Sequence, residues 1–235
     1  MSEKTTTVVL VHGAFADASS WNEVVADLTA RGIPALAPAN ELSGAARDGS
    51  RLAAQVREID GPVVLVGHSY GGAVITAAAN EADNVTGLVY VAAFVPDEGE
   101  TLGGLNDSFP ATEFGAGLAP HTLPASDGGE EVWLSIATDK FHQLFAADVP
   151  DAQADVMARS QRPVAAAAFV EKAGPASWKR LPSHFLIATG DQAIHPDGER
   201  SMAERAGGTI LEIDASHAVS VSQPKAVADF IVSAL

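Results

Sequence analysis

Apolar positions along the chain follow two alternating patterns. Short, largely β-branched runs predict strands at residues 6–11, 33–38, 62–66, 85–94, 182–189 and 209–213. Stretches with apolar residues at helical spacing lie between them, at residues 20–31, 43–59, 73–79 and 223–235. Because strands alternate with helices over nearly the whole chain, we expect one α/β domain with a doubly wound, mostly parallel sheet covered on both faces.

One region interrupts this alternation. Residues 97–181 are richer in Gly, Pro and Asp, and their patterned segments are short, at 131–138, 139–146 and 152–162. We interpret the region as an insertion that forms a cap over the site, with an excursion that has no function as the alternative. The predicted domains are a core of residues 1–96 and 182–235 and a cap of residues 97–181.

Composition narrows the classes of partner. Thirty acidic residues against 14 basic ones give a formal net charge of −16, which disfavours nucleic acid and anionic membranes because both require a basic surface. The absence of cysteine excludes a disulfide framework and thiolate catalysis. The polar N-terminus lacks the apolar segment of a secretory signal, and the apolar runs are too short to span a membrane, so we expect a cytoplasmic protein.

The segment around Ser69 carries the clearest chemical signal. Gly67-His68-Ser69-Tyr70-Gly71 directly follows the apolar run at 62–66 and precedes a helical stretch. A strand that enters Gly-x-Ser-x-Gly and continues as a helix is the sequence form of a nucleophile elbow. Glycines lack the Cβ atom that would prevent close packing around this strained turn. Ser69 is therefore the predicted nucleophile.

A serine hydroxyl needs a base to remove its proton. Among the seven histidines, His217 lies in the loop after the last predicted strand. Loops at the carboxyl ends of parallel strands meet at one crevice, so His217 can reach Ser69 there. We expect His12, in contrast, to hold neighbouring loops together through hydrogen bonds.

The base must in turn be oriented by a buried carboxylate. Asp191, which follows the strand at 182–189, is the predicted acid. Asp97, after the strand at 85–94, stays as an alternative. Asp214 is a further candidate, but it stands only three residues before His217 and is expected to be too close in sequence to reach around the ring.

A developing oxyanion requires hydrogen-bond donors that are already in place. The backbone N–H of Tyr70, directly after the nucleophile, is one expected donor. The loop after the first strand, His12-Gly13-Ala14, offers the backbone N–H of Ala14 as the second. In the cap, Trp133, Phe141 and Phe145 are candidates for an apolar wall of the pocket, although aromatic residues at such spacing are more often core.

These motifs together resemble the α/β-hydrolase superfamily over essentially the whole chain. More narrowly, the chain is similar to plant methyl esterases and hydroxynitrile lyases and their bacterial esterase-like relatives. The matching stretches are Val9 to Ala14 with Trp21, Val64 to Gly72, Thr189 to Ile194, and Ser216-His217. The resemblance implies an α/β-hydrolase fold with a small cap inserted before the strand that carries the catalytic acid. It also implies a Ser69–His217–Asp191 triad and no cofactor.

Two departures from the lyases favour ester hydrolysis. Lyases of this group typically carry Thr where Gly13 stands and Lys where Ala218 stands, and the nearest downstream lysine here is Lys225. We therefore expect a serine hydrolase that cleaves small carboxylic esters through an acyl-enzyme. The alternatives are lactone or C–C bond hydrolysis on the same triad, a hydroxynitrile lyase, and a non-catalytic small-molecule-binding protein.

The expected partner is a small-molecule substrate, and a homodimer is compatible with the sequence. His195 and Asp197 lie close together, but two residues do not make a zinc site, so we expect no metal.

Overall fold

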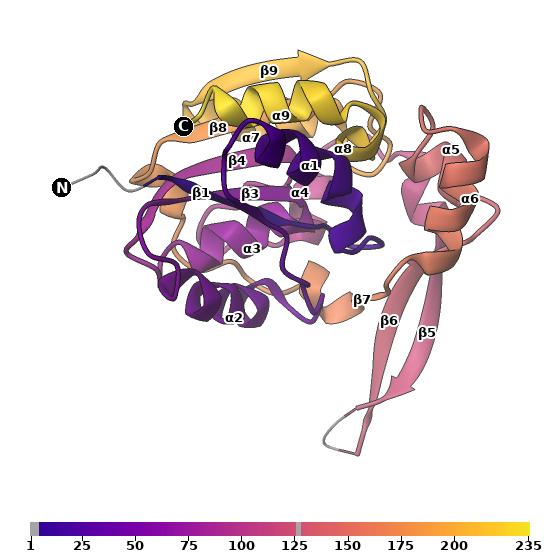
Figure 1. Ribbon diagram of the computed structural model, residues 1–235. Coiled ribbons are helices and arrows are strands. Elements are labelled where there is room, and N and C mark those ends of the chain that lie inside the picture. The colour runs from indigo at the N-terminus through magenta and orange to yellow at the C-terminus, as the bar shows by residue number, and fades with distance from the viewer. Residues whose placement is uncertain (1–4, 126–127) are drawn as a thin grey trace.

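A six-stranded sheet forms the centre of the molecule. The structure is a computed structural model, and it describes residues 5–125 and 128–235 (Figure 1). The strand order is β2-β1-β3-β4-β8-β9, and all neighbouring strands are parallel. The strands are β1 (Thr7–Val11), β2 (Ala35–Leu36), β3 (Val63–Ser69), β4 (Val85–Ala93), β8 (Ser183–Ala188) and β9 (Thr209–Ile213). The predicted parallel sheet is confirmed.

Helices cover both faces of this sheet. On one face lie α2 (Ala45–Arg57), α3 (Tyr70–Ala78) and α7 (Pro196–Ala206), and on the other lie α1 (Asn22–Ala30), α8 (Val219–Ser222) and α9 (Pro224–Val232). Successive residues of β1 alternate between the two cores: Val9 packs in the first and Val8 in the second. Since both faces of the central strands are covered, β3 is buried along its whole length, and its first four residues are all apolar.

The region between β4 and β8 forms a second, smaller sheet with its own helices. Strand β5 (Leu118–Pro124) pairs antiparallel with β6 (Glu130–Ile136), and β6 pairs antiparallel with β7 (Val164–Ala165). In Figure 1 the β5–β6 hairpin projects from the core. The helices of this region are α4 (Leu102–Asp107), α5 (Phe141–Phe145) and α6 (Asp151–Ser160). The predicted segments at 131–138, 139–146 and 152–162 correspond to β6, α5 and α6.

Short 3-10 helices connect several of these elements. They lie at Ala18–Trp21, Glu113–Gly117, Ala166–Phe169 and Ser177–Lys179. No helix in the described part of the chain combines the length and the apolar character needed to cross a bilayer.

Helix α7 and strand β5 were not predicted. The start and stop signals of α7 are nevertheless present in the sequence: His195 caps the helix by accepting the N–H of Asp197 at 3.2 Å, Pro196 is its first residue, and Gly207 ends it with a φ of 75°. The apolar periodicity is weak because the buried face of α7 includes Glu199 beside Met202.

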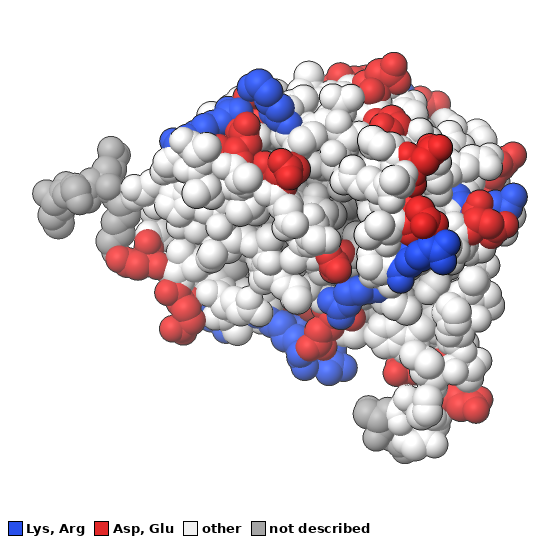
Figure 2. All heavy atoms as spheres, turned by 45° about the vertical axis from the view of Figure 1, so that its right-hand side comes forward, with Lys and Arg blue, Asp and Glu red and all other residues white. Residues whose placement is uncertain are grey.

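Charged side chains on the surface are largely intermixed. Figure 2 shows acidic side chains distributed over one face, with basic side chains beside several of them. Arg200, for example, pairs with Glu212 at 2.8 Å, and Arg159 pairs with Asp155 at 3.0 Å.

Candidate active site

Ser69 is held in a strained backbone conformation between β3 and α3. Its φ of 54° and ψ of −123° lie where non-glycine residues are rare, at a cost of about 1–3 kcal/mol. The flanking glycines allow this turn: a Cβ on Gly67 would lie 2.5 Å from the carbonyl oxygen of Gly71, and a Cβ on Gly71 would lie 2.5 Å from that of Val11. The strand, helix and neighbouring β1 loop therefore pack with no room for a side chain, which is the geometry expected of an elbow.

His217 and Asp191 form a buried hydrogen-bonded pair. The side chains are 1% and 0% exposed, and His217 Nδ1 donates to Asp191 Oδ2. The other carboxylate oxygen of Asp191 accepts the N–H groups of Ala193 at 2.6 Å and Ile194 at 3.0 Å. With its proton on Nδ1, the imidazole keeps its Nε2 lone pair free to accept a proton. Ser69 and His217 line the same small pocket.

Neither alternative carboxylate takes the place of Asp191. Asp97 accepts a hydrogen bond at 2.5 Å from Lys179, which lowers the pKa of its carboxyl. Asp214 is exposed. Of the three candidate acids, the structure thus brings Asp191 to His217.

The imidazole of His217 packs against two other rings. His68 lies 4.7 Å away between ring centroids, and Phe145 of α5 lies 4.9 Å away. His68 Nε2–H donates to the carbonyl oxygen of His217 at 2.8 Å, and burial lowers the pKa of His68 well below its usual range, which keeps it neutral. The side chain of His68 therefore supports the loop of His217, and it does not take part in the pair with Asp191.

The inserted region also holds the His217 loop. The N–H of Ala218 donates to the carbonyl oxygen of Phe145 at 3.0 Å. Ser216 Oγ donates to Asp148, which follows α5. These contacts were not predicted, because they depend on how a distant segment folds back onto the core.

His12 has the structural role that was expected. Its Nε2 accepts the N–H of Asn40 at 2.9 Å, so the proton is on Nδ1, which donates to the carbonyl oxygen of Gly13 at 2.9 Å. Burial lowers the pKa of this imidazole. His12 thereby joins the loop after β1 to the segment that precedes α2.

Ala14 and Tyr70 line the pocket together with Ser69 and His217. Tyr70 is the first residue of α3, so its backbone N–H has no acceptor within the helix and points from the positive end of the helix dipole. The Tyr70 hydroxyl donates to Asp48 at 2.8 Å and accepts the N–H of Gly44 at 3.1 Å. These bonds fix the residue directly after the serine.

The pocket around Ser69 is small and aromatic. It measures about 20 Å³ and is lined by side chains that include Phe15, Phe94, Phe114 and Phe169. It adjoins a groove of about 310 Å³ that shares Phe114 and Phe169 and extends past Leu118 and Leu134 of the inserted region. The small pocket at Ser69 therefore borders a larger groove on the side of the inserted region.

None of the three aromatic residues predicted for the pocket wall is part of its lining. Phe145 contacts the ring of His217, and Phe141 packs against Phe145 with 4.9 Å between their ring centroids. Trp133 lies on β6 and does not line the pocket. Phe114 and Phe169, which the sequence did not single out, line the pocket instead.

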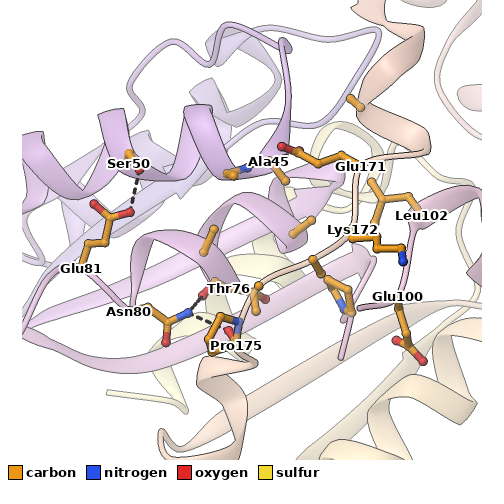
Figure 3. A pocket seen from close by; sticks show the side chains of 17 residues that line it. Ala45, Ser50, Thr76, Asn80, Glu81, Glu100, Leu102, Glu171, Lys172 and Pro175 are labelled. Atoms are coloured by element: carbon orange, nitrogen blue, oxygen red, sulfur yellow. Dashed lines mark hydrogen bonds between the residues drawn. The ribbon is translucent and has the colours of Figure 1, made fainter. Parts of the chain in front are cut away.

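A separate hollow of about 180 Å³ lies between α2, α3 and residues 168–175 (Figure 3). Two hydrogen bonds join groups of its lining: Ser50 donates to Glu81 at 2.6 Å, and Asn80 donates to the carbonyl oxygen of Pro175 at 2.7 Å. The predicted site residues are not part of its lining. Within residues 5–125 and 128–235, no three His, Asp or Glu side chains gather as a metal site.

Comparison with known proteins shows the family to which the chain belongs. The alpha/beta hydrolase family matches residues 8–230. The carbendazim hydrolyzing esterase of Nocardioides sp. (strain SG-4G) is 36% identical over 110 residues, 40% of this chain and 44% of that protein, so this match spans less than half of the relative. Methylesterase 2 of Arabidopsis thaliana is 24% identical over 252 aligned positions, covering 96% of this chain and 94% of the relative.

Among solved structures, polyneuridine aldehyde esterase matches with a TM-score of 0.85 at 18% identity, covering 98% of this chain and 99% of that chain. The α/β-hydrolase fold and the likeness to esterases of the plant methyl esterase group are confirmed. The chain belongs to the alpha/beta hydrolase family and is a hydrolytic enzyme.

Proposed function

We propose that this enzyme cleaves small carboxylic esters through an acyl-enzyme intermediate, with Ser69 as nucleophile, His217 as base and Asp191 as orienting acid. The observation that carries the proposal is the buried hydrogen bond from His217 Nδ1 to Asp191, in a pocket that also contains the strained Ser69. A serine on such a turn beside an imidazole with a fixed tautomer matches the roles required for acyl transfer.

The reaction follows from these positions. His217 Nε2 takes the hydroxyl proton of Ser69 as the oxygen attacks the ester carbonyl, and Asp191 stabilises the imidazolium that forms. His217 then gives this proton to the departing alcohol, which leaves Ser69 acylated. His217 then deprotonates a water molecule, which attacks the acyl carbonyl. As the bond between Ser69 and the acyl group breaks and the acid is released, His217 returns this proton to Ser69 Oγ.

The backbone N–H groups of Ala14 and Tyr70 are the proposed donors to the oxyanion. Both residues line the pocket at Ser69, and the Tyr70 N–H stands at the N-terminus of α3, where negative charge is favoured. The contacts that hold Tyr70 to Asp48 and Gly44 keep this donor in place before substrate binds.

The structure also favours ester hydrolysis over cyanohydrin cleavage. A Cβ on Gly13 would lie 2.6 Å from the Cβ of Ser69, so the threonine typical of lyases does not fit here without a shift of the loop. Lys225 pairs with Asp229 at 3.4 Å on the exposed face of α9 and is not in the pocket lining. The names of the relatives, which are esterases, point in the same direction.

Hydrolysis of p-nitrophenyl acetate, butyrate and octanoate tests the proposal. We expect Ser69→Ala and His217→Ala to lose at least ~10³-fold in kcat. Ser233→Ala and His121→Ala, which change an exposed serine and an exposed histidine, serve as matched controls and should keep wild-type rates.

A fluorophosphonate probe separates the possible failures. Labelling of wild type but not of Ser69→Ala, without ester turnover, would move the substrate class to lactones or C–C bonds. A folded protein that is neither labelled nor active would indicate a binding protein. A small-molecule partner, a homodimer and a cytoplasmic location stay predictions.

A further inference from the structure

A second carboxyl group is buried behind the proposed triad. Glu199 lies in α7, and its side chain faces the core beside Met202, with the residue only 3% exposed. Glutamate is rarely buried to this extent unless it is paired, because an ionised carboxylate without partners is costly in an apolar environment. The adjacent Arg200 does not form an ion pair with Glu199, since its guanidinium is bound to Glu212 and Asp197 at the surface.

The contacts of Glu199 lead to Asp191. One carboxyl oxygen of Glu199 accepts the N–H of Ala188, the last residue of β8, at 3.4 Å. The other oxygen is buried and has no N–H or O–H donor of another residue within reach. The carboxyl group of Asp191 lies within hydrogen-bonding reach of the Glu199 side chain. Two carboxyl groups can share a hydrogen bond only when one of them carries a proton.

The surroundings of the two groups decide where the proton resides. Asp191 accepts three N–H donors, from Ala193, Ile194 and His217, so both of its oxygens already serve as acceptors. Glu199 accepts a single long bond. Burial, together with the neighbouring charge of Asp191, raises the pKa of the Glu199 carboxyl well above its usual range. The pair therefore divides into one anion and one neutral acid.

We propose that Glu199 is a positioning residue whose neutral carboxylic acid donates a hydrogen bond to Asp191 and holds that carboxylate toward His217. Glu199 also accepts from β8, so it connects α7, the end of β8 and the loop that carries Asp191. The core behind His217 then holds one buried negative charge and not two. The inference rests on the proposed function, in which Asp191 orients the base.

The charged groups that act on Glu199 are Asp191, from the loop after β8, and Arg200, from its own helix. Two substitutions separate donation of a hydrogen bond from simple packing. Glu199→Gln keeps the shape and a donor but cannot ionise, and Glu199→Met keeps an apolar chain of similar length without a donor. We expect Glu199→Gln to retain kcat within about threefold. Glu199→Met should lower kcat by about 10- to 100-fold with little change in KM, because the substrate groove is untouched.

The pH profile gives a readout that packing alone would not move. The acid limb of kcat/KM reports protonation of the base in the free enzyme. If Glu199 is neutral, Glu199→Gln leaves this limb in place. An ionised Glu199 would favour the imidazolium, so its removal would move the limb to lower pH. Such a shift, or equal losses of kcat in both variants, would overturn the proposal.

Infrared difference spectroscopy of the wild type and Glu199→Gln tests the proton directly. We expect the C=O band of a protonated carboxylic acid near pH 7 in the wild type and its loss in the variant. Absence of this band would refute the neutral acid. The measurement does not require turnover, so it stays informative if the ester proposal fails or if Glu199→Met does not fold.

Discussion

Replacement of Asp191 by asparagine tests the orientation of the base most sharply. Oδ1 of Asp191 accepts two backbone N–H groups, from Ala193 and Ile194. An asparagine has one acceptor oxygen, and these two donors will hold it at the same position. Its NH₂ group then faces His217 Nδ1, where the wild type has an acceptor. Two donors cannot face each other, so the imidazole must take the other tautomer, with its proton on Nε2.

This tautomer removes the lone pair that would accept the proton of Ser69. We expect Asp191→Asn to lower kcat by about 10⁴-fold, as is typical when the acid of a serine triad is replaced in this way, while binding of substrate changes little. A 10⁴-fold loss corresponds to about 5.5 kcal/mol of activation free energy. Because Asn is nearly isosteric with Asp, the folded structure should persist, which circular dichroism can verify.

The assay is the steady-state hydrolysis of p-nitrophenyl butyrate by wild type, Asp191→Asn and Asp97→Asn. Asp97 was the alternative acid, and its carboxylate is bound to Lys179, so Asp97→Asn is a matched control that should stay within about twofold of wild type. If Asp191→Asn retains more than a tenth of the activity, or if Asp97→Asn loses as much, the assignment of the acid is wrong.

Three further results are expected. Gly13→Ala places a Cβ 2.6 Å from that of Ser69, so overpacking should cost about 1–3 kcal/mol of stability and lower kcat, measured by urea unfolding and ester hydrolysis. Unchanged stability would show that the loop shifts freely. Tyr70→Phe leaves Asp48 and Gly44 without their shared hydroxyl and should cost about 1–3 kcal/mol in the same unfolding assay, whereas an equal stability of the two proteins would mean that water replaces the hydroxyl. The third result concerns the pH dependence of stability. The pKa of the Glu199 carboxyl is raised in the folded protein, whereas in the unfolded chain it has its ordinary value of 4.5. As pH rises above 4.5, the unfolded chain therefore loses the Glu199 proton while the folded protein still holds it. The unfolding free energy of wild type should therefore fall relative to that of Glu199→Gln, by at most about 1.4 kcal/mol per pH unit until the raised pKa is passed. A constant difference between pH 4 and 8 would contradict the raised value.

The elements that are set by local patterns could be predicted from the sequence. The elbow at Ser69 is recognisable because only glycine fits beside so strained a turn, and the two glycines occupy fixed positions relative to the serine. The covered strands are recognisable because burial on both faces demands continuous apolar runs. His217 could be placed by its position after the last strand, since parallel strands direct their carboxyl ends to one edge.

Which carboxylate meets His217 was decided by the tertiary structure. Strands β8 and β9 are neighbours, and the N–H of Gly190 donates to the carbonyl oxygen of Ala215 at 3.0 Å, which joins the loops that carry Asp191 and His217. Asp97 also follows a strand, but Lys179 from a distant segment engages it. The spacing of residues along the chain does not reveal the order of the strands in the sheet. For this reason the sequence left both Asp191 and Asp97 as candidates for the carboxylate that meets His217.

The same limit applies to Glu199 and to the pocket. Glu199 reads as an ordinary surface residue in a polar helix, and its burial against Asp191 follows only from the packing of α7 on β8. Phe114 and Phe169 line the pocket because the inserted region folds back over the core. Local sterics and periodicity therefore determine the strands, the strained turn and the position of Ser69 on it. Contacts between segments far apart in the chain determine which carboxylate meets His217, which group is buried beside it and the shape of the pocket, because their energies depend on three-dimensional packing that no local pattern records.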